Sequence, residues 1–558
     1  MVAPSRWRCL VISTLLEPFR KPIGTVGSKA ALPSSSGQSR NHERCLVSRS
    51  SPKHRWGVLV ISVGLISSFA GPASADTSGT LVISADTTLV EDHQGPVVIA
   101  ADDVILDCAG HSVSGPGPAG ILLDGRTGVT IRNCGVTGFT QGLLLINSSE
   151  VTLVANTAAD NDESGFVVVL GSNDNRLTDN HASANGLIGF LLDGERNIAA
   201  GNRSTENGNA GYVVGMNSND STLADNTSSA NGDAGYRFDD ANGNTAMGNS
   251  ATSNGNAGFL LVNSTGNILT TNSSRSNALG GFALHFSNDN QLRDNNASQN
   301  GAWGFVVEGD RNAIVDNRAT TNADVGFLLV NSTGNSLLAN LSQSNGLDGF
   351  RLNLSDGNEV RENTASSNAA LGFAIEGEGN AIVDNQATVN ADAGFVLGIE
   401  SANNTLVGNA ASGNGHAGFR FDGAGGNTVT NNSATGNIAD GFLLSGATVN
   451  TLVRNTALSN GASGFALVGG SDNNIMVGST SSNNDLHGLV LDGSSHSRLH
   501  TNVAKANGDA GIALINGSSF NEVTRNTGCR NASFDAIDDL TGVENTWSNN
   551  RFCTTSGI

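Results

Sequence analysis

The sequence predicts an all-β fold, a parallel β-helix (solenoid) of about 18 or more coils with ~23 residues per coil. Three observations predict it. A glycine followed by an apolar residue recurs at steps of 22 to 24 residues. Asparagines five residues apart recur along the array, and from Asn185 to Asn507 the last of each repeat precedes the next glycine by four residues. Two pairs of cysteines occupy equivalent positions one repeat apart, near opposite ends of the array.

Each repeat reads approximately Gly-Phe-x-Leu, a variable turn, Asn-x-Leu-x-x-Asn, four residues, a third Asn and three more residues. Short alternating segments between Gly and Asn are typical of strands, and no stretch of the array keeps the three-and-four spacing of a helix. Three short strands and three turns form one coil, and neighbouring coils stack at ~4.8 Å. The repeat glycines are Gly120, Gly142, Gly165, Gly189, Gly211, Gly235, Gly258, Gly281, Gly304, Gly326, Gly349, Gly372, Gly394, Gly418, Gly441, Gly464, Gly488 and Gly511.

Stacking places identical repeat positions above one another. The residue after the glycine is expected to form an interior aromatic stack, which Tyr212 and Tyr236 continue between phenylalanines. The asparagines are expected to form ladders of side-chain amides. Asn also tolerates the left-handed conformation, so we expect it to occupy the corners of the coil.

The cysteines of the array predict two disulfides, because stacking brings equivalent positions within the Cα separation that a disulfide tolerates. The pairs are Cys108 with Cys134 and Cys529 with Cys553, and both indicate an oxidising compartment. The sequence contains no C-x-x-C motif and no Cys/His cluster, so we expect no metal site.

Residues 1–75 have the features of a leader with a signal peptide. An apolar h-region at about 57–70 follows basic residues and precedes Ala73-x-Ala75, so the mature chain is predicted to begin near Asp76. The alternative is an uncleaved membrane anchor, and a true start near Val47 is a further hypothesis. Either way the folded part is expected to be secreted, periplasmic or on the cell surface. The predicted domains are this leader, an N-terminal cap with the first coils at 76–119, β-helix coils at 120–532 and a C-terminal cap at 533–558.

Charge and composition exclude several classes of function. Residues 76–558 carry 19 basic and 48 acidic side chains, and only 14% of all residues are charged. A surface this acidic repels nucleic acid, and membrane contact is expected only through an uncleaved leader.

The opening coils resemble those of right-handed parallel β-helix repeat proteins. The resemblance rests on the segments Leu106–Gly115, Gly120–Leu123 and Val129–Cys134 and on a pattern that continues over 100–530. The closest resemblance is to NosD-like proteins, within the wider pectate-lyase type of fold. That group is named for a periplasmic protein that helps to mature a copper enzyme. The resemblance implies architecture and not an activity.

Side chains alternate along each Gly-Phe-x-Leu-x strand, so both x positions are expected to face outward. The first x position is apolar in all but three coils, which predicts an exposed apolar stripe and suggests a partner or ligand platform. Its members are Leu122, Leu144, Val167, Leu191, Val213, Arg237, Leu260, Ala283, Val306, Leu328, Arg351, Ala374, Val396, Arg420, Leu443, Ala466, Val490 and Ala513.

The second x position carries most of the acids of this face, together with His285. These acids are Asp124, Asp193, Asp239, Glu308, Glu376, Asp422 and Asp492. No two of them occupy adjacent coils, which suits solubility and strand register because like charges repel at strand spacing. Arg237 and Arg420 share a coil with Asp239 and Asp422, and we expect ordinary surface ion pairs there. Alternatively, these four residues and Arg351 bind carboxylates or hydroxyls of an elongated ligand.

Catalytic chemistry has few candidates in this sequence. Glu308, Asp310 and Arg311 are the weak candidates for a polysaccharide lyase, epimerase or hydrolase. Long loops that would wall a cleft are absent from the repeats, because the turn after the glycine varies in length by only two residues.

No cofactor is expected. The acids before the second Asn of the repeat could bind calcium between coils, but ordinary solvated turns are the favoured explanation, because no calcium-binding nonapeptide motif is present. These acids include Asp179, Asp225, Asp294, Asp316 and Asp384.

The sequence therefore favours a secreted or surface β-helix that binds an elongated ligand without catalysis. A polysaccharide or an envelope protein is the expected partner. The first alternative is a carbohydrate-active enzyme, and the second is a structural spacer or adhesin.

Overall fold

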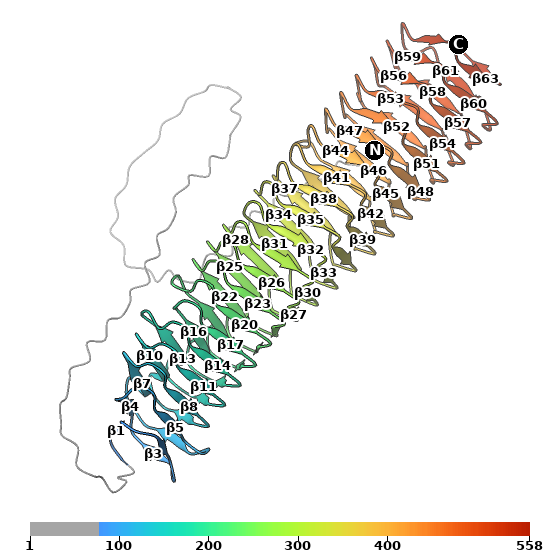
Figure 1. Ribbon diagram of the computed structural model, residues 1–558. Helices are drawn as coiled ribbons and strands as arrows, with labels where there is room; N and C mark the ends of the chain where they lie inside the picture. Colours follow the sequence, from blue (N-terminus) through green and yellow to red (C-terminus); the bar gives the residue numbers. More distant parts are fainter. Residues whose placement is uncertain (1–77) are drawn as a thin grey trace, which may run out of the picture. The chain divides into compact units, whose positions relative to one another are not determined.

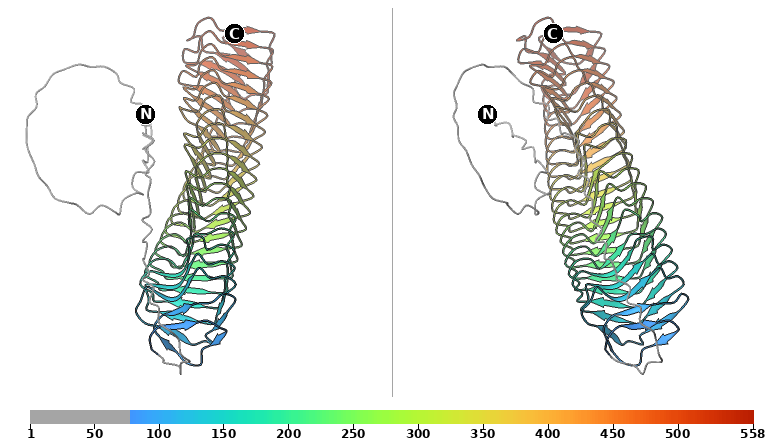
Figure 2. Two further views of the ribbon diagram at one scale, coloured as in Figure 1. Left: turned by 60° about the vertical axis from the view of Figure 1, so that its left-hand side comes forward. Right: turned by 90° about the vertical axis from the view of Figure 1, so that its left-hand side faces the viewer.

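Stacked β-strands make up the whole of the folded part of the chain. The computed structural model describes residues 78–558, which contain strands, turns and bends and no helix (Figure 1). Figure 2 shows the coils stacked into a rod, each contributing one strand to each of three parallel sheets. The predicted leader and its cleavage site lie outside the described residues. None of the described segments is a helix suited to spanning a membrane.

Sheet B contains the Gly-Phe strands. Its strands are β1 (Leu81–Ile83), β4 (Val97–Ile99), β7 (Ala119–Asp124), β10 (Gln141–Ile146), β13 (Ser164–Val169), β16 (Phe190–Leu192), β19 (Tyr212–Val214), β22 (Tyr236–Asp239), β25 (Phe259–Val262), β28 (Phe282–His285), β31 (Phe305–Glu308), β34 (Phe327–Val330), β37 (Phe350–Asn353), β40 (Phe373–Glu376), β43 (Phe395–Leu397), β46 (Phe419–Asp422), β49 (Phe442–Ser445), β52 (Phe465–Val468), β55 (Leu489–Asp492), β58 (Ile512–Ile515), β61 (Ala536–Asp538) and β64 (Thr555–Ser556).

Sheet C contains the strands that follow the variable turn. They are β2 (Thr87–Thr88), β5 (Ile105–Asp107), β8 (Thr130–Arg132), β11 (Thr152–Val154), β14 (Arg176–Thr178), β17 (Ile198–Ala200), β20 (Thr222–Ala224), β23 (Thr245–Met247), β26 (Ile268–Thr270), β29 (Gln291–Arg293), β32 (Ala313–Val315), β35 (Ser336–Leu338), β38 (Glu359–Arg361), β41 (Ala381–Val383), β44 (Thr405–Val407), β47 (Thr428–Thr430), β50 (Thr451–Val453), β53 (Ile475–Val477), β56 (Arg498–His500), β59 (Glu522–Thr524) and β62 (Thr546–Ser548).

Sheet A contains the third strand of each coil. Its members are β3 (His93–Gln94), β6 (Ser112–Ser114), β9 (Gly135–Thr137), β12 (Thr157–Ala159), β15 (His181–Ser183), β18 (Arg203–Thr205), β21 (Thr227–Ser229), β24 (Ser250–Thr252), β27 (Ser273–Arg275), β30 (Asn296–Ser298), β33 (Arg318–Thr320), β36 (Leu341–Gln343), β39 (Thr364–Ser366), β42 (Gln386–Thr388), β45 (Ala410–Ser412), β48 (Ser433–Thr435), β51 (Thr456–Leu458), β54 (Thr480–Ser482), β57 (Val503–Lys505), β60 (Thr527–Cys529) and β63 (Arg551–Phe552).

The register stacks equivalent repeat positions, as the periodicity predicts. Leu143 of β10 pairs with Ile121 of β7 below and with Phe166 of β13 above. Parallel pairing of this kind continues to β64, so strands of the same sheets run through both ends that the sequence analysis assigned to caps. The predicted all-β parallel β-helix is confirmed.

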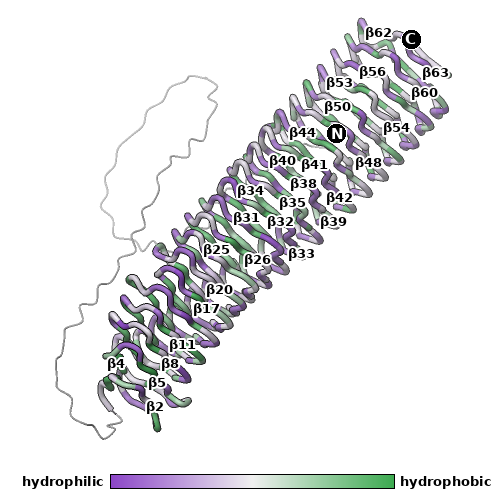
Figure 3. The backbone as a smooth tube through the Cα atoms, in the orientation of Figure 1, coloured by the Kyte–Doolittle hydropathy of each residue, from purple (hydrophilic) through white to green (hydrophobic). Residues whose placement is uncertain are grey.

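An aromatic stack fills one side of the interior, as predicted. The rings from Phe166 to Phe465 stand one per coil, with centroids 4.6–4.8 Å apart and interplanar angles of 4–9°. The hydroxyls of Tyr212 and Tyr236 donate to backbone carbonyls, which lets both rings stay buried. Apolar and polar residues alternate along the tube at the same places in successive coils (Figure 3).

Three ladders of buried asparagines line the corners of the rod. In one ladder, Nδ2 of Asn317 donates to Oδ1 of Asn340 at 3.2 Å and to the carbonyl of Leu292 at 2.8 Å. Its Oδ1 accepts from both the backbone N–H and Nδ2 of Asn295, at 2.9 and 3.0 Å. Every polar atom of the side chain therefore has a partner, which removes the penalty for burying an amide.

The left-handed corner residue is not the ladder asparagine, contrary to the sequence analysis. Asp179 and Ala184 have φ of 55° and 53°, and each directly precedes a ladder asparagine. The asparagine must point its side chain inward and donate its own N–H to the next coil, so the residue before it makes the turn. For residues other than glycine this conformation costs roughly 1–2 kcal/mol.

Disulfides close both ends of the array, as predicted. Cys108 pairs with Cys134 and Cys529 with Cys553, with Cα atoms 4.8 and 5.4 Å apart. The first bond joins the second coil, which contains β5, to the third coil, which contains β8. The second bond joins the last two coils, which contain β60 and β63.

We expect Asn317→Ala to lower the free energy of unfolding by about 3 kcal/mol, because it leaves several buried polar groups of neighbouring coils without partners. Asn317→Ser should cost less. Ser479 already occupies a ladder position and accepts from the backbone N–H of Asn455 at 3.2 Å. Denaturation midpoints of the two variants test this, and equal losses for Ala and Ser would contradict the role given to the ladder.

Val389→Gly should stabilise the protein by about 1 kcal/mol although it removes a large side chain. Val389 is 64% exposed and has φ of 55°, and the equivalent positions of the next two coils already hold Gly413 and Gly436. The matched control is Val330→Gly, which lies in β34 with ordinary strand geometry and should destabilise. Thermal denaturation checks both signs, and a loss of stability in Val389→Gly would count against corner strain.

Candidate functional site on the outer face of sheet B

Three rows of side chains cover the outer face of sheet B, each contributing one residue per coil. The leading row is the residue before the repeat glycine, the middle row is the second residue after it, and the trailing row is the fourth. The position of the repeat glycine has no room for a larger residue. A Cβ on Gly304 would lie 2.6 Å from the carbonyl oxygen of Gly326 and 2.7 Å from the Cβ of Ala319.

The middle row is not an exposed stripe, which corrects the sequence analysis. Most of its apolar members are buried, and none is exposed. The leading and trailing rows cover the middle row from both sides, because their side chains rise from the same face of the sheet. Exposure therefore cannot be read from strand alternation alone on this face.

Four apolar clusters occupy the face, and the arginines of the middle row separate them. The first cluster is formed around Leu144 and Val167, and the second around Leu260 and Val306. The third is centred on Ala374 and Val396 and the fourth on Ala466 and Val490. Arg237, Arg351 and Arg420 stand in the coils between successive clusters. The face thus alternates between apolar and charged segments along the rod.

Arg237 and Arg420 form the ion pairs that the sequence analysis expected. Nε of Arg237 lies 2.8 Å from Asp239, and its Nη1 lies 3.4 Å from Asp233. Arg420 contacts Asp422 at 3.0 Å and Asp392 at 3.2 Å, and its side chain is only 14% exposed. Burial raises the pKa of Asp239, and the neighbouring Arg237 opposes that rise.

Arg351 has a different carboxylate partner, in the leading row. Its Nε donates to Asp348 at 2.7 Å, and the side chain of Asp348 is 1% exposed. Asp348 also accepts the backbone N–H of Leu371 at 3.0 Å. Two further carboxylates face this group, Asp324 and Glu376, and burial raises the pKa of both while Arg351 lowers it. Three acids therefore share one guanidinium.

The three weak catalytic candidates do not converge. Glu308 pairs with Nδ1 of His285 at 3.1 Å. Asp310 accepts from the backbone N–H and hydroxyl of Thr333 in the next coil, at 2.9 and 3.0 Å. Arg311 forms a bidentate pair with Asp289 of the previous coil, at 2.7 Å for both bonds. Asp310 and Arg311 thus tie coils together at a corner, away from Glu308.

The leading row contains functional candidates that sequence reasoning missed. Most members of this row are small or aliphatic. The sequence feature that could have revealed the candidates is the departure from that pattern at Trp303, Asp348, Asp440 and His487. Burial raises the pKa of Asp440, which accepts the backbone N–H of Ser463 at 2.8 Å. The indole of Trp303 packs against the cluster around Leu260 and Val306.

The acids that could have bound calcium occupy corner positions. Asp179, Asp225, Asp294, Asp316 and Asp384 all have φ between 53° and 56°, so the left-handed turn explains why Asp stands there. Asp294 and Asp316 both contact Arg293, at 3.4 and 3.1 Å.

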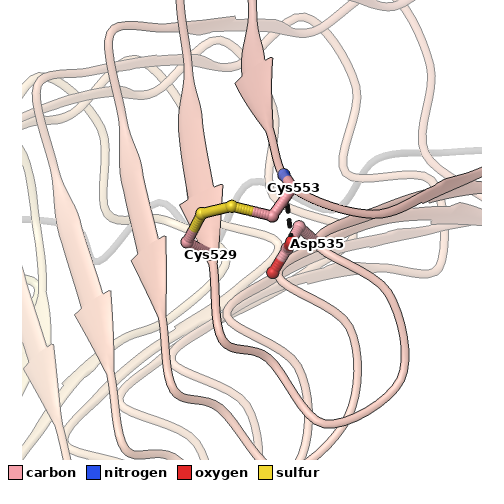
Figure 4. A group of neighbouring side chains, drawn as sticks. All are labelled: Cys529, Asp535 and Cys553. Carbon is pink, nitrogen blue, oxygen red and sulfur yellow. Dashed lines mark hydrogen bonds between the residues drawn. A yellow bond between two sulfur atoms is a disulfide. The ribbon is translucent and has the colours of Figure 1, made fainter.

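One group of three metal-ligating side chains occurs within residues 78–558, at the C-terminal end (Figure 4). It consists of Cys529, Asp535 and Cys553, and the two sulfurs are joined in the disulfide. Asp535 accepts hydrogen bonds from Asn531, from the backbone N–H of Cys553 and from Thr554. Burial raises the pKa of Asp535, but these hydrogen bonds outweigh burial and leave the pKa below its usual value. Asp535 takes the place of the next asparagine in a ladder and ends it.

Two family models match the chain. A model described as "Right handed beta helix region" matches residues 119–275, in agreement with the expected handedness. A model described as "Periplasmic copper-binding protein (NosD)" matches residues 261–391, 305–414 and 376–556, which together span more than half of the chain. A search of curated proteins found no match.

Solved structures with a similar chain path include enzymes that act on alginate. The periplasmic alginate epimerase AlgG is 12% identical with a TM-score of 0.35, over 64% of this chain and 77% of that chain. The A-module of the Azotobacter vinelandii mannuronan C-5 epimerase AlgE4 is 14% identical with a TM-score of 0.32, over 60% and 86%. An alginate lyase from Paenibacillus is 13% identical with a TM-score of 0.25, over 47% and 87%.

The carboxylates around Arg351 make stability depend on pH in a defined direction. Burial raises the pKa of Asp324 and Glu376 in the folded state, so the folded protein binds protons more tightly than the unfolded chain. The free energy of unfolding should therefore rise as the pH falls from neutral through these raised pKa values, and it should decrease when the pH is brought back to neutral. Asp324→Asn should flatten this dependence and stabilise the protein at neutral pH.

Asp289→Asn is the matched control with the opposite sign. The hydrogen bonds from Arg311 lower the pKa of Asp289, so its ionised form is favoured in the folded state and its removal should not stabilise at neutral pH. Melting temperatures measured between pH 5 and 8 compare the two variants. A wild-type stability that rises with pH over this range, unchanged by Asp324→Asn, would contradict the assignment.

Proposed function

This chain belongs to the NosD family of β-helix proteins, and we propose that it binds an elongated glycan along the outer face of sheet B without cleaving it. The observation that carries the proposal is the alternation on that face, where apolar clusters are separated by Arg237, Arg351 and Arg420, each paired with carboxylates. Such a pattern suits a ligand that is itself a repeat of apolar and polar surfaces.

Sugars present C–H groups on their ring faces and hydroxyls at their edges. The partly exposed side chains at the margins of the clusters, such as Ile146, Val262 and Leu328, offer surface for the ring faces. An arginine–carboxylate pair offers both donors and acceptors in a fixed geometry, which is what hydroxyls require because each both donates and accepts.

Binding is favoured over cleavage because the acids of the trailing row are spaced apart. Paired carboxylates of glycosidases stand roughly 5–9.5 Å apart. The acids of the trailing row, such as Asp239 and its nearest neighbour in the row, Asp193, are separated by a coil without an acid. Two coils correspond to about 9.6 Å. The repeat steps of 22 to 24 residues also leave no long insertion to enclose a substrate.

The family description implies copper, and the residues present do not fit it. Cys529, Asp535 and Cys553 are the one group of three potential ligands within 78–558. Their sulfurs are consumed by the disulfide, and the carboxylate of Asp535 is occupied by hydrogen bonds. Copper ligation in proteins relies on free thiolates, imidazoles and thioethers. We therefore propose no copper site within residues 78–558.

A location outside the cytoplasm is part of the proposal. The match to a family described as periplasmic supports it, and so do the two disulfides. The predicted leader of residues 1–75 would provide the route.

Size-exclusion chromatography of the full chain with neutral and uronate polysaccharides, with and without calcium, tests the function. We expect the protein to co-elute with a polymer of unchanged length. Arg237→Ala and Arg420→Ala should weaken that association by about tenfold each, as expected for residues at the centre of a contact. Arg311→Ala is the matched control, because it also breaks an arginine–aspartate pair but lies at a corner.

Each other outcome has a distinct meaning. If the polymer becomes shorter, the protein is a carbohydrate-active enzyme, and Glu308 becomes the first residue to mutate. Absence of any association across the panel would favour the structural spacer. An equal loss of binding in Arg311→Ala would show that the face is not the binding surface.

A further inference from the structure

Trp303 stands apart from every other member of the leading row. We propose that its indole is the stacking platform of a sugar subsite for neutral, hydroxyl-rich pyranosides, flanked by His285, Glu308 and Asp324. This inference rests on the proposed function and names the class of sugar and the place where one unit binds.

Gly280 makes the platform possible. It is the residue of the leading row one coil before Trp303, and it is the only glycine among the leading-row residues from Ala119 to Ala510. A Cβ built on Gly280 would lie 2.6 Å from Cδ1 and 2.9 Å from Cε2 of the Trp303 ring, and closer still to Nε1. Several atoms of the five-membered ring approach that one point, so the ring lies over the glycine backbone. The indole is thereby held against the sheet.

The indole is only partly covered in this position. Trp303 is intermediate in exposure, whereas its leading-row neighbour Val325 is buried. Its apolar surroundings include Ala283, Val306 and Leu328 in the middle row. A rigid aromatic ring backed by apolar side chains and open on part of its surface is the arrangement on which the C–H face of a pyranose stacks.

Polar groups lie on the coils next to the indole. In the trailing row, His285 and Glu308 pair across the same two coils that hold Gly280 and Trp303, at 3.1 Å. One coil further on, Oδ1 of Asp324 is buried and has no hydrogen-bond donor among the described residues. Nε1 of Trp303 is likewise buried without a partner among the described residues, and unpartnered buried polar groups are unfavourable.

The charges select the class of sugar. Glu308 and Asp324 are both acidic side chains, and they stand on adjacent coils. A uronate would bring its carboxylate next to these groups and be repelled. Neutral pyranosides present only hydroxyls and escape this repulsion, so they are the ligands that the subsite accepts.

Fluorescence of Trp303 provides a direct test. The chain has four tryptophans, so replacing Trp7, Trp56 and Trp547 with phenylalanine leaves Trp303 as the single reporter. Cellohexaose, xylohexaose and maltohexaose are the neutral probes, and hexagalacturonate and hexamannuronate are the acidic ones. We expect at least one neutral probe to shift the emission saturably and the acidic probes to leave it unchanged. A saturable shift with the acidic probes alone would overturn the proposal.

Variants separate the platform from a structural role. Trp303→Ala should weaken binding of the neutral probe by about tenfold in calorimetry, and Trp303→Phe should recover part of the loss. Gly280→Ala keeps the indole but displaces it, and should also weaken binding. Phe520→Ala is the control, because this exposed ring stacks on His496 near the C-terminal end and should leave binding unchanged. Melting curves confirm that each variant folds.

The two proposals fail in different ways. If no polysaccharide associates with the wild-type chain, the proposed function falls and this inference falls with it. If a polysaccharide associates equally with the wild type and with folded Trp303→Ala, the proposed function stands and the platform alone is rejected.

Discussion

The amide of the buried asparagine is the interaction on which the rest of this structure depends. Each rung joins two coils through Nδ2, Oδ1 and the backbone N–H, so it fixes both the distance between coils and their rotation about the axis. A coil with one residue too many at a corner would lose three such bonds at once. The ladders therefore hold the repeat near 23 residues, and the aromatic stack and the strand register follow from that constancy.

Constant coils restrict where function can reside. When every coil follows the same backbone path, specificity cannot come from loops of different length. It must come from departures within otherwise uniform rows, such as Arg351 among aliphatic residues or Trp303 among small ones. These departures lie on one face of the rod, where flanking rows bury the backbone and weaken the screening of charge. The outer face of sheet B is thus the part of the rod with the most varied chemistry.

The sequence was sufficient for the architecture because each repeat carried the same information many times. Fold class, register, the Phe166–Phe465 stack and both disulfides follow from spacing alone, since stacking converts sequence period into spatial contact. The left-handed corners were assigned to the wrong residue, because Asn tolerates that conformation but is needed inside the rod. The domain limits and the leader remain predictions.

The face was harder to predict because its burial depends on three rows together. Alternation along one strand shows which side of the sheet a residue occupies, and it does not show that neighbours such as Trp303 and Asp348 cover the middle row. The partner of Arg351 was missed for the same reason. Asp348 stands before the glycine, outside the alternating segment, and only the turn of the backbone brings its carboxylate to the guanidinium.

The disulfides at the two ends bear on the lifetime of the protein. In a linear array each coil contacts only its neighbours, so loss of structure propagates most easily from a terminal coil, which has one neighbour instead of two. One covalent link joins the second coil to the third and another joins the last two coils, so both stop this unzipping close to an end of the rod. Proteases outside the cell cut chains that open transiently, and the rate of opening then sets survival. The rod therefore resists degradation kinetically, because disulfides slow opening near its ends and the asparagine ladders stabilise the coils between them.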